Sequence, residues 1–129
     1  MSRVLFPDVE DVLTGYLSEL VGGVVSTRVP SERPGRFLKL NRTGGSRRGR
    51  TVEAVWVDFE AWGATETEAY ELAADAVSHM EAAPGDPDFP GNLYRVGVVG
   101  APAVLPDPVS DASRYVFKLE LVLAGRVVS

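Results

Sequence analysis

Residues 114–123 read RYVFKLELVL, and apolar side chains occupy every second position of this stretch. The apolar set is Tyr115, Phe117, Leu119, Leu121 and Leu123, which alternates with Arg114, Val116, Lys118, Glu120 and Val122. A period of two is typical of a β-strand that buries one face. The stretch therefore predicts a sheet with one strongly buried face, and the rest of the fold is built around that sheet.

A second long strand is predicted over residues 51–62, TVEAVWVDFEAW. One face carries Val55, Val57, Phe59 and Ala61, and the other carries Ala54, Trp56, Asp58, Glu60 and Trp62. Tryptophan is enriched in interface hot spots. Trp56, Trp62, Asp58 and Glu60 are therefore candidate interface residues. The alternative, weighted equally for the two indoles, is that a further layer of the fold covers them.

Two amphipathic helices are predicted from apolar residues at helical spacing. The first follows Asp8, a candidate N-cap, and ends at Gly22-Gly23, and the second stops before Pro84-Gly85. Their apolar positions are Val9, Val12, Leu13, Tyr16, Leu17 and Leu20 in the first, and Ala69, Leu72, Ala73, Ala76, Val77 and Met80 in the second. The opposite face of the second helix is acidic, with Glu66, Glu68, Glu71 and Asp75.

Shorter strands are predicted over residues 24–28, 37–42 and 93–99, separated by proline-rich turns. The element order is helix, three strands, helix, two strands. This order predicts an α+β domain with a mainly antiparallel sheet of about five strands and both helices on one face. A chain of 129 residues suits one domain, spanning residues 1–129.

Positive charge is concentrated between Arg28 and Arg50, which contains eight of the thirteen basic residues and only one acid, Glu32. The whole chain nevertheless has a net charge of −5, so the remainder is strongly acidic. Residues 42–50, RTGGSRRGR, are rich in glycine and arginine and predict a long, projecting, mobile hairpin loop. An isolated cationic feature on an acidic domain indicates a partner.

Three interpretations of this arginine loop remain open. It is a solvated hairpin tip, it binds nucleic-acid phosphates, or it docks onto an acidic surface of another copy or another protein. The acidic surface could be the face of the second helix, or Asp58 with Glu60. In either binding interpretation the contact residues are Arg42, Arg47, Arg48 and Arg50.

The sequence contains few residues suited to catalysis or to binding a cofactor. The chain has no cysteine and a single histidine, His79, which removes the usual zinc sites and the thiol nucleophiles. Carboxylate pairs at Asp58 and Glu60 and at Asp86 and Asp88 are weak magnesium candidates, because such pairs are common on solvated surfaces. We therefore expect no enzyme, no cofactor and no bound metal.

The chain is expected to be soluble and made in a reducing cytosol. It lacks cysteine, and no apolar run is long enough to span a bilayer. No secretory signal peptide is expected, because Pro7-Asp8 directly follows the short apolar N-terminal segment.

A series of motifs is arranged in order along most of the chain. It consists of the leading helix, Ser26-Thr27-Arg28-Val29-Pro30 with Arg33-Pro34 and Phe37, Arg42-Thr43-Gly44-Gly45, the Ala-rich helix, and Leu105-Pro106-Asp107-Pro108 before Arg114-Tyr115-Val116-Phe117. In this order and spacing the chain resembles the small tail terminator proteins of long-tailed actinobacterial bacteriophages. No single piece is diagnostic; the order and spacing carry the resemblance.

The resemblance implies a structural subunit of a virion that is made in the host cytoplasm. Such proteins form rings, usually of six copies, that cap the tail tube, end its polymerisation and dock the tail to the head connector. The implied partners are other copies of the chain, the tail tube protein, the head-completion or stopper protein and double-stranded DNA in the lumen. Alternatives are a neighbouring neck protein, meaning a head-completion or tail tube subunit, and a nucleic-acid-binding accessory module that uses the arginine loop.

Overall fold

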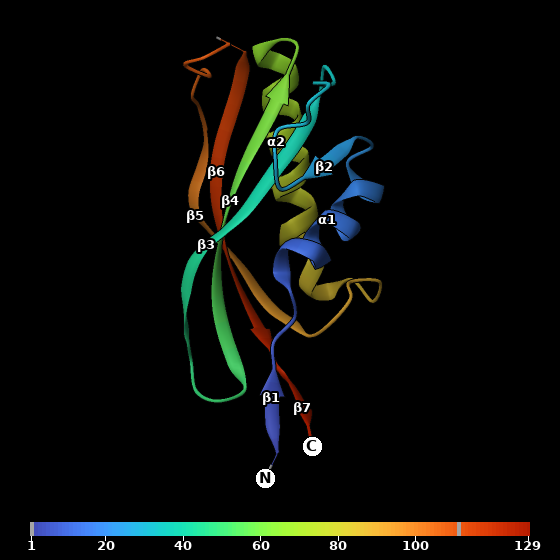
Figure 1. The fold of residues 1–129 in the computed structure, drawn as a ribbon, viewed down its shortest axis with the longest axis vertical. Helices are drawn as coiled ribbons and strands as arrows, with labels where there is room; N and C mark the ends of the chain where they lie inside the picture. The colour runs from blue at the N-terminus through green and yellow to red at the C-terminus, as the bar shows by residue number, and fades with distance from the viewer. Residues whose placement is uncertain (1, 111) are drawn as a thin grey trace.

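The computed structural model describes residues 2–110 and 112–129 as an α+β fold with both helices on one face of a twisted sheet (Figure 1). The predicted fold class is confirmed. The elements are β1 (Arg3–Leu5), α1 (Val9–Leu20), β2 (Val24–Ser26), β3 (Phe37–Arg47), β4 (Val52–Gly63), α2 (Glu66–Ala82), the 3-10 turn η1 (Ala83–Gly85), β5 (Leu93–Val104), β6 (Ser113–Ala124) and β7 (Arg126–Val128).

The main sheet has the strand order β2-β3-β4-β6-β5. Its pairs are antiparallel except β2 with β3, which run parallel. The two strands with the clearest alternation in the sequence, β4 and β6, are neighbours at the centre and pair over their whole length, from Val52 opposite Ala124 to Gly63 opposite Ser113. A central strand pair with one apolar face each forms the floor of the core.

Both helices begin at side-chain caps. Asp8 accepts a hydrogen bond from the Asp11 amide, as the sequence predicted, and Thr65 accepts one from the Glu68 amide. Three buried alanines of α2, Ala69, Ala73 and Ala76, let this helix lie close to β4 and β6. The core between the helices and the sheet includes Leu13, Leu17, Leu38, Leu40, Val55, Val57, Phe59, Leu72, Met80, Leu119 and Leu121.

The arginine hairpin is more ordered than predicted. Strand β3 continues to Arg47, so only residues 48–51 form the turn. The expected loop over residues 42–50 is therefore wrong for residues 42–47, which belong to the strand. A register shift between Arg42 and Gly44 accommodates the glycines. Gly45 has φ +132°, and a Cβ there would lie 2.0 Å from the Ala54 carbonyl oxygen. Glycine is thus required where β3 crosses β4 most closely.

A short ribbon of β1 and β7 was missed by the sequence analysis. Arg3, Val4 and Leu5 pair antiparallel with Val128, Val127 and Arg126. Both strands have three residues, too few for a period of two to be recognised. The ribbon brings the two ends of the chain together at one end of the long axis of the molecule, the same end as the β3–β4 hairpin (Figure 1).

Candidate interaction surface

The arginine hairpin contains one buried carboxylate. Glu53 on β4 is 6% exposed, and among the described residues it is the charged side chain that is buried. Its two oxygens accept from Arg42 Nη2 and Arg47 Nε, each at 3.0 Å. A carboxylate buried this far needs cationic partners to offset its lost hydration. Two of the four predicted contact arginines therefore have an internal structural role.

Further contacts tie these two arginines to the body of the protein. The Arg47 guanidinium lies 4.1 Å from the centre of the Phe6 ring, and the Arg42 amide donates to Glu10 of α1 at 2.8 Å. The first contact has cation–π geometry. The lower half of β3 is consequently attached to α1 and to the N-terminal segment, in addition to its pairing with β4.

Arg48 and Arg50 differ from this pair because they extend from the turn. Arg48 lies 3.4 Å from Glu120 on the helix-free face of the sheet, and the Arg48 side chain is exposed to solvent. Arg50 donates to the backbone carbonyl of Ser2 at 2.5 Å. Contacts of this exposed kind contribute little to stability, so Arg48 and Arg50 are the members of the predicted set that are free to change partners.

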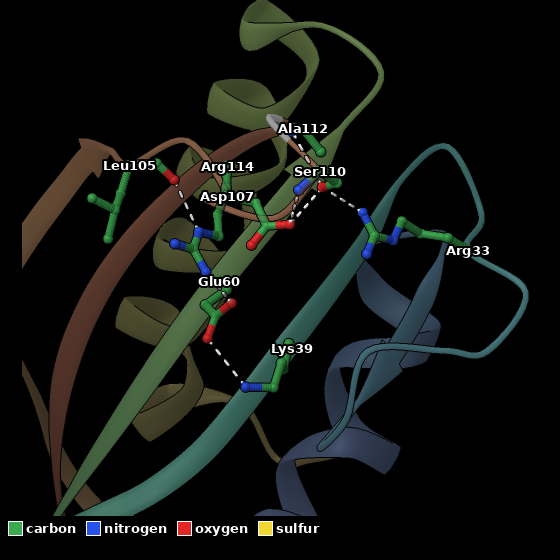
Figure 2. A network of polar contacts seen from close by, with 8 residues as sticks. All are labelled: Arg33, Lys39, Glu60, Leu105, Asp107, Ser110, Ala112 and Arg114. Carbon is green, nitrogen blue, oxygen red and sulfur yellow. Dashed lines mark hydrogen bonds and ion pairs between the residues drawn. The ribbon is translucent and has the colours of Figure 1, made fainter.

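The sheet face opposite the helices carries a ladder of cross-strand ion pairs. Glu60 on β4 binds Lys39 of β3 and Arg114 of β6, each at 3.1 Å, and Figure 2 shows these three side chains pointing toward one another. One step further along β4, Asp58 lies 3.4 Å from Lys118. Lys39 and Glu60, and likewise Asp58 and Lys118, stand directly opposite each other in the strand register.

The ladder changes the interpretation of Asp58 and Glu60. The sequence offered these acids as an acceptor for the arginine loop, but each already has a cationic partner on a neighbouring strand. The acids of α2 differ from them: Glu66, Glu68 and Glu71 are exposed on the first turns of that helix. Among the acidic surfaces that the sequence proposed, the first turns of α2 are the one whose exposed acids have no cationic partner among the described ion pairs.

The two tryptophans, predicted to share one environment, differ. Trp62 is 3% exposed; it stacks on Phe37 at 5.2 Å, with the guanidinium groups of Arg33 and Arg114 at 4.9 and 5.3 Å from its ring. Arg33 of the loop before β3 and Arg114 of β6 therefore cover Trp62. Of the two alternatives that the sequence left open, coverage by a further part of the fold holds for this tryptophan.

Trp56 remains a candidate interface residue. Its side chain is 40% exposed on the helix-free face, where its Nε1 donates to Glu120 at 2.8 Å. Lys118 lies 5.2 Å from the ring, and Arg95 joins Arg48 at the same Glu120 carboxylate. An indole held in place and surrounded by arginine and lysine is typical of an interface anchor.

The sequence analysis missed Glu53, Arg95 and Glu120 as parts of this surface. Glu53 belongs to the buried face of β4 by its alternation with Val55, a signal that the sequence did contain. Arg95 and Glu120 are adjacent only because β5 pairs with β6, and the local sequence pattern does not predict which strands pair.

The loop after α2 also contains a strong polar contact. The Tyr16 hydroxyl donates to Asp86 at 2.6 Å. Burial and this bond raise the pKa of Tyr16 to about 12, and the same bond lowers the pKa of Asp86. Asp88 donates its amide to the other oxygen of Asp86. The pair at Asp86 and Asp88, predicted as a weak magnesium candidate, is thus a turn that holds the loop to α1.

Across residues 2–110 and 112–129, no three His, Asp or Glu side chains are grouped in a way that could hold a metal ion. His79 lies 3.4 Å from Asp75 on α2 and has no nucleophile beside it among the described contacts. Within the same residues, no helix combines the length and the apolar character needed to cross a bilayer. The chemical features of this surface are its paired charges and the exposed indole of Trp56.

Comparisons with known proteins give a structural likeness. No protein-family model and no curated protein sequence matches the chain. A chain from a solved structure described as the "Virion of native gene transfer agent (GTA) particle" superposes with a TM-score of 0.58, at 18% sequence identity. The superposition covers 84% of this chain and 84% of that chain. The two proteins share a fold.

Proposed function

We propose that the protein is a structural subunit of a bacteriophage virion, and that it forms the ring, usually of six copies, that caps the tail tube. In this role it ends tail polymerisation and docks the tail to the head connector, with no catalytic activity. It would be made in the host cytoplasm and located at the head–tail junction. Its neighbours would be further copies of the chain, the tail tube protein and the head-completion protein, with the DNA passing through the lumen.

The observation that carries this proposal is the shared fold with a chain of a gene transfer agent virion over most of both chains. The resemblance of motifs such as Ser26–Pro30 and Arg42–Gly45 to tail terminators points the same way. The surface supports it as well, because it offers protein-binding chemistry through Trp56, Arg48 and Arg50.

A nucleic-acid-binding module is the alternative from another class. Arg42 and Arg47 are already paired with Glu53. Of the four predicted contact residues, Arg48 and Arg50 therefore remain to bind phosphates. Duplex binding by the isolated chain would show a dependence on salt whose slope counts the phosphates that are neutralised. A salt slope near that of two arginines is the expected result for this alternative, and no duplex binding at low ionic strength would contradict it.

The proposal is tested by inactivating the gene in the genome that encodes this chain and imaging the particles by electron microscopy. Tails that are longer than normal and unattached to heads are the expected result for a tail terminator. Tails of normal length beside leaking or tailless heads would move the protein to the head side of the junction. Intact infectious particles would contradict a role in the virion.

A further inference from the structure

The 105–110 loop after β5 is tied to the sheet by hydrogen bonds although these residues form no helix or strand. The Asp107 carboxylate accepts from the amide and the hydroxyl of Ser110, and Arg33 donates to the same hydroxyl at 2.8 Å. At the base of the loop, Arg114 Nε donates to the Leu105 carbonyl while its Nη1 reaches Glu60. Figure 2 shows that this network fastens the loop to the ion-pair ladder of the sheet.

This hydrogen-bonded loop presents an apolar side chain to solvent. Val109 is 93% exposed, the highest value among the exposed large apolar residues, and Leu105 at the loop base is also exposed. A fixed loop loses little conformational entropy when it binds. An apolar side chain at the tip of such a loop, beside a carboxylate, is a suitable anchor for an apolar groove with a basic rim.

A groove of that kind lies at the opposite end of the same molecule. It has a volume of about 590 Å³ and runs between the N-terminal segment Leu5–Pro7 and the junction Ala124–Arg126 of β6 and β7. Its lining is mostly apolar and includes no acidic residue, and Arg126 is exposed at its edge. Arg3 lies on the neighbouring strand of the same ribbon, and the Arg50 side chain bonds to Ser2 beside it.

The two ends of the molecule differ in charge. One end holds Asp107 of the 105–110 loop and the exposed glutamates on the first turns of α2, together with Arg33 and Arg114, which bond to that loop (Figures 1 and 2). The other end holds the terminal ribbon and the hairpin with their arginines, so Asp107 and the glutamates are the groups that could face those arginines in another copy. The ends are too far apart along the long axis to meet within one chain, so an apolar anchor and its groove can meet only between copies.

We infer that the 105–110 loop of one copy docks into the Leu5–Arg126 groove of the next, with Val109 in the apolar floor and Asp107 toward Arg126. The contact is head-to-tail, and a head-to-tail contact repeated from copy to copy forms a ring when its rotation closes and an open filament when it does not. The inference rests on the proposed function, for which it identifies the contact between subunits. The complementary partner is a second copy of this chain.

Site-specific cross-linking tests this contact, because the chain has no cysteine of its own. Leu5→Cys and Val109→Cys are combined in one chain and treated with a flexible bismaleimide, both as concentrated purified protein and in assembled particles. Each change replaces an exposed apolar side chain, so the fold is retained. The expected product is a ladder of covalent oligomers, in which each step adds one copy.

The matched control pairs Leu5→Cys with Val99→Cys, since Val99 is an exposed valine on β5 outside the loop. A docked contact raises the effective concentration of the two thiols, so the Leu5–Val109 pair should cross-link roughly tenfold or more above the control. Adding Arg126→Glu should reduce that yield at low ionic strength. Equal yields from the two pairs, in the purified protein and in particles, would overturn the inference.

Mixing two single variants adds a test of direction. A chain carrying only Val109→Cys, mixed with a chain carrying only Leu5→Cys, should yield covalent dimers and no longer species, whereas either variant alone should yield none. Dimers formed by Val109→Cys alone would instead indicate a two-fold symmetric contact and contradict the head-to-tail arrangement. If tails are normal when the gene is inactivated but the ladder forms, the contact stands and the proposed virion role fails.

Discussion

At the scale of single residues, Glu53 and its two arginine partners differ in how far they are buried. The carboxylate is buried, while the side chains of Arg42 and Arg47 are 39% and 58% exposed. Water can therefore replace Glu53 as a partner of the arginines more readily than it can replace the arginines as partners of the buried Glu53. Truncating Glu53 and truncating its two arginine partners should therefore lower the free energy of unfolding by different amounts.

We expect Glu53→Ala to lower the free energy of unfolding by roughly 1–2 kcal/mol, the loss of two charge-assisted hydrogen bonds to half-exposed groups. The double change Arg42→Ala with Arg47→Ala should lower it by roughly 3–5 kcal/mol, because an uncompensated buried carboxylate remains. Urea denaturation of the two variants beside the wild type measures both. Equal losses, or a larger loss for Glu53→Ala, would contradict this assignment of the buried partner.

The Tyr16–Asp86 bond predicts a dependence of stability on pH. Folding raises the pKa of Tyr16 to about 12, so the folded chain holds this proton more tightly, and stability is lost as the pH rises from about 10 to 12. The pKa of Asp86 is lowered in the fold, so its contribution is lost as the pH falls below the usual aspartate value near 3.8. Between these limits the bond is intact.

Tyr16→Phe removes the donor and isolates this contribution. At neutral pH the variant should be less stable by roughly 0.5–1.5 kcal/mol, the net value of one hydrogen bond. The difference between wild type and variant should shrink above pH 10 and again below pH 4, as followed by thermal unfolding across the pH range. A constant difference from pH 3 to pH 12 would show that the hydroxyl does not act through its bond to Asp86.

At the scale of secondary-structure elements, the β3–β4 hairpin depends on two adjacent glycines with different constraints. Gly44 and Gly45 both have positive φ, +147° and +132°, a region that side chains rarely occupy. A Cβ on Gly44 meets nothing within 4 Å, whereas one on Gly45 lies within 3 Å of the backbone of Ala54 and Val55. Gly44 is required only for its backbone conformation, and Gly45 for conformation and space.

Gly44→Ala should therefore lower the free energy of unfolding by roughly 1–2 kcal/mol, from backbone strain alone. Gly45→Ala should lower it by roughly 2–5 kcal/mol, because strain and a backbone clash add. Denaturation of the two alanine variants under one set of conditions makes the comparison, and each is the control for the other. Similar losses at both positions would mean that β3 can move away from β4 at no extra free energy.

Strand alternation and helix caps were enough to predict most elements. Phe117, Leu119 and Leu121 of β6 are buried as their period of two indicates, and Asp8 caps α1 as its place before Val9 indicates. The extent of β3 was not predictable in the same way, because Thr43–Arg47 contains no apolar residue. That segment is a strand through its pairing with β4 and through Glu53, which follow it directly in the hairpin but leave no apolar alternation in the segment itself.

At the scale of the whole molecule, the arginines of the hairpin divide into a structural pair and an exposed pair, and this division makes a functional prediction. Arg48→Ala combined with Arg50→Ala should change the free energy of unfolding by less than about 0.5 kcal/mol, as exposed contacts usually do. Under the proposed function, the same variant should still weaken attachment of tails to heads, because it removes two accessible charges.

The measurement is complementation of the inactivated gene with this double variant, scored as the fraction of particles with attached tails and as infectious titre at several salt concentrations. A matched double variant, Arg28→Ala with Arg36→Ala, removes two exposed charges from the 27–36 loop outside the hairpin. Full complementation by the Arg48 and Arg50 variant would remove the hairpin tip from the docking surface. Failure of both variants alike would show a dependence on total charge and not on position.

The sequence by itself determined the fold class, the two central strands and the two helices, because periodicity, caps and turn residues act between neighbours in the chain. Only the tertiary structure decided which charges are available. It placed Glu53 between Arg42 and Arg47, set Asp58 and Glu60 into a cross-strand ladder, and covered Trp62 while leaving Trp56 exposed. These outcomes depend on strand register and on loops that meet across the sheet, and such contacts are set by packing between segments that lie far apart in the sequence.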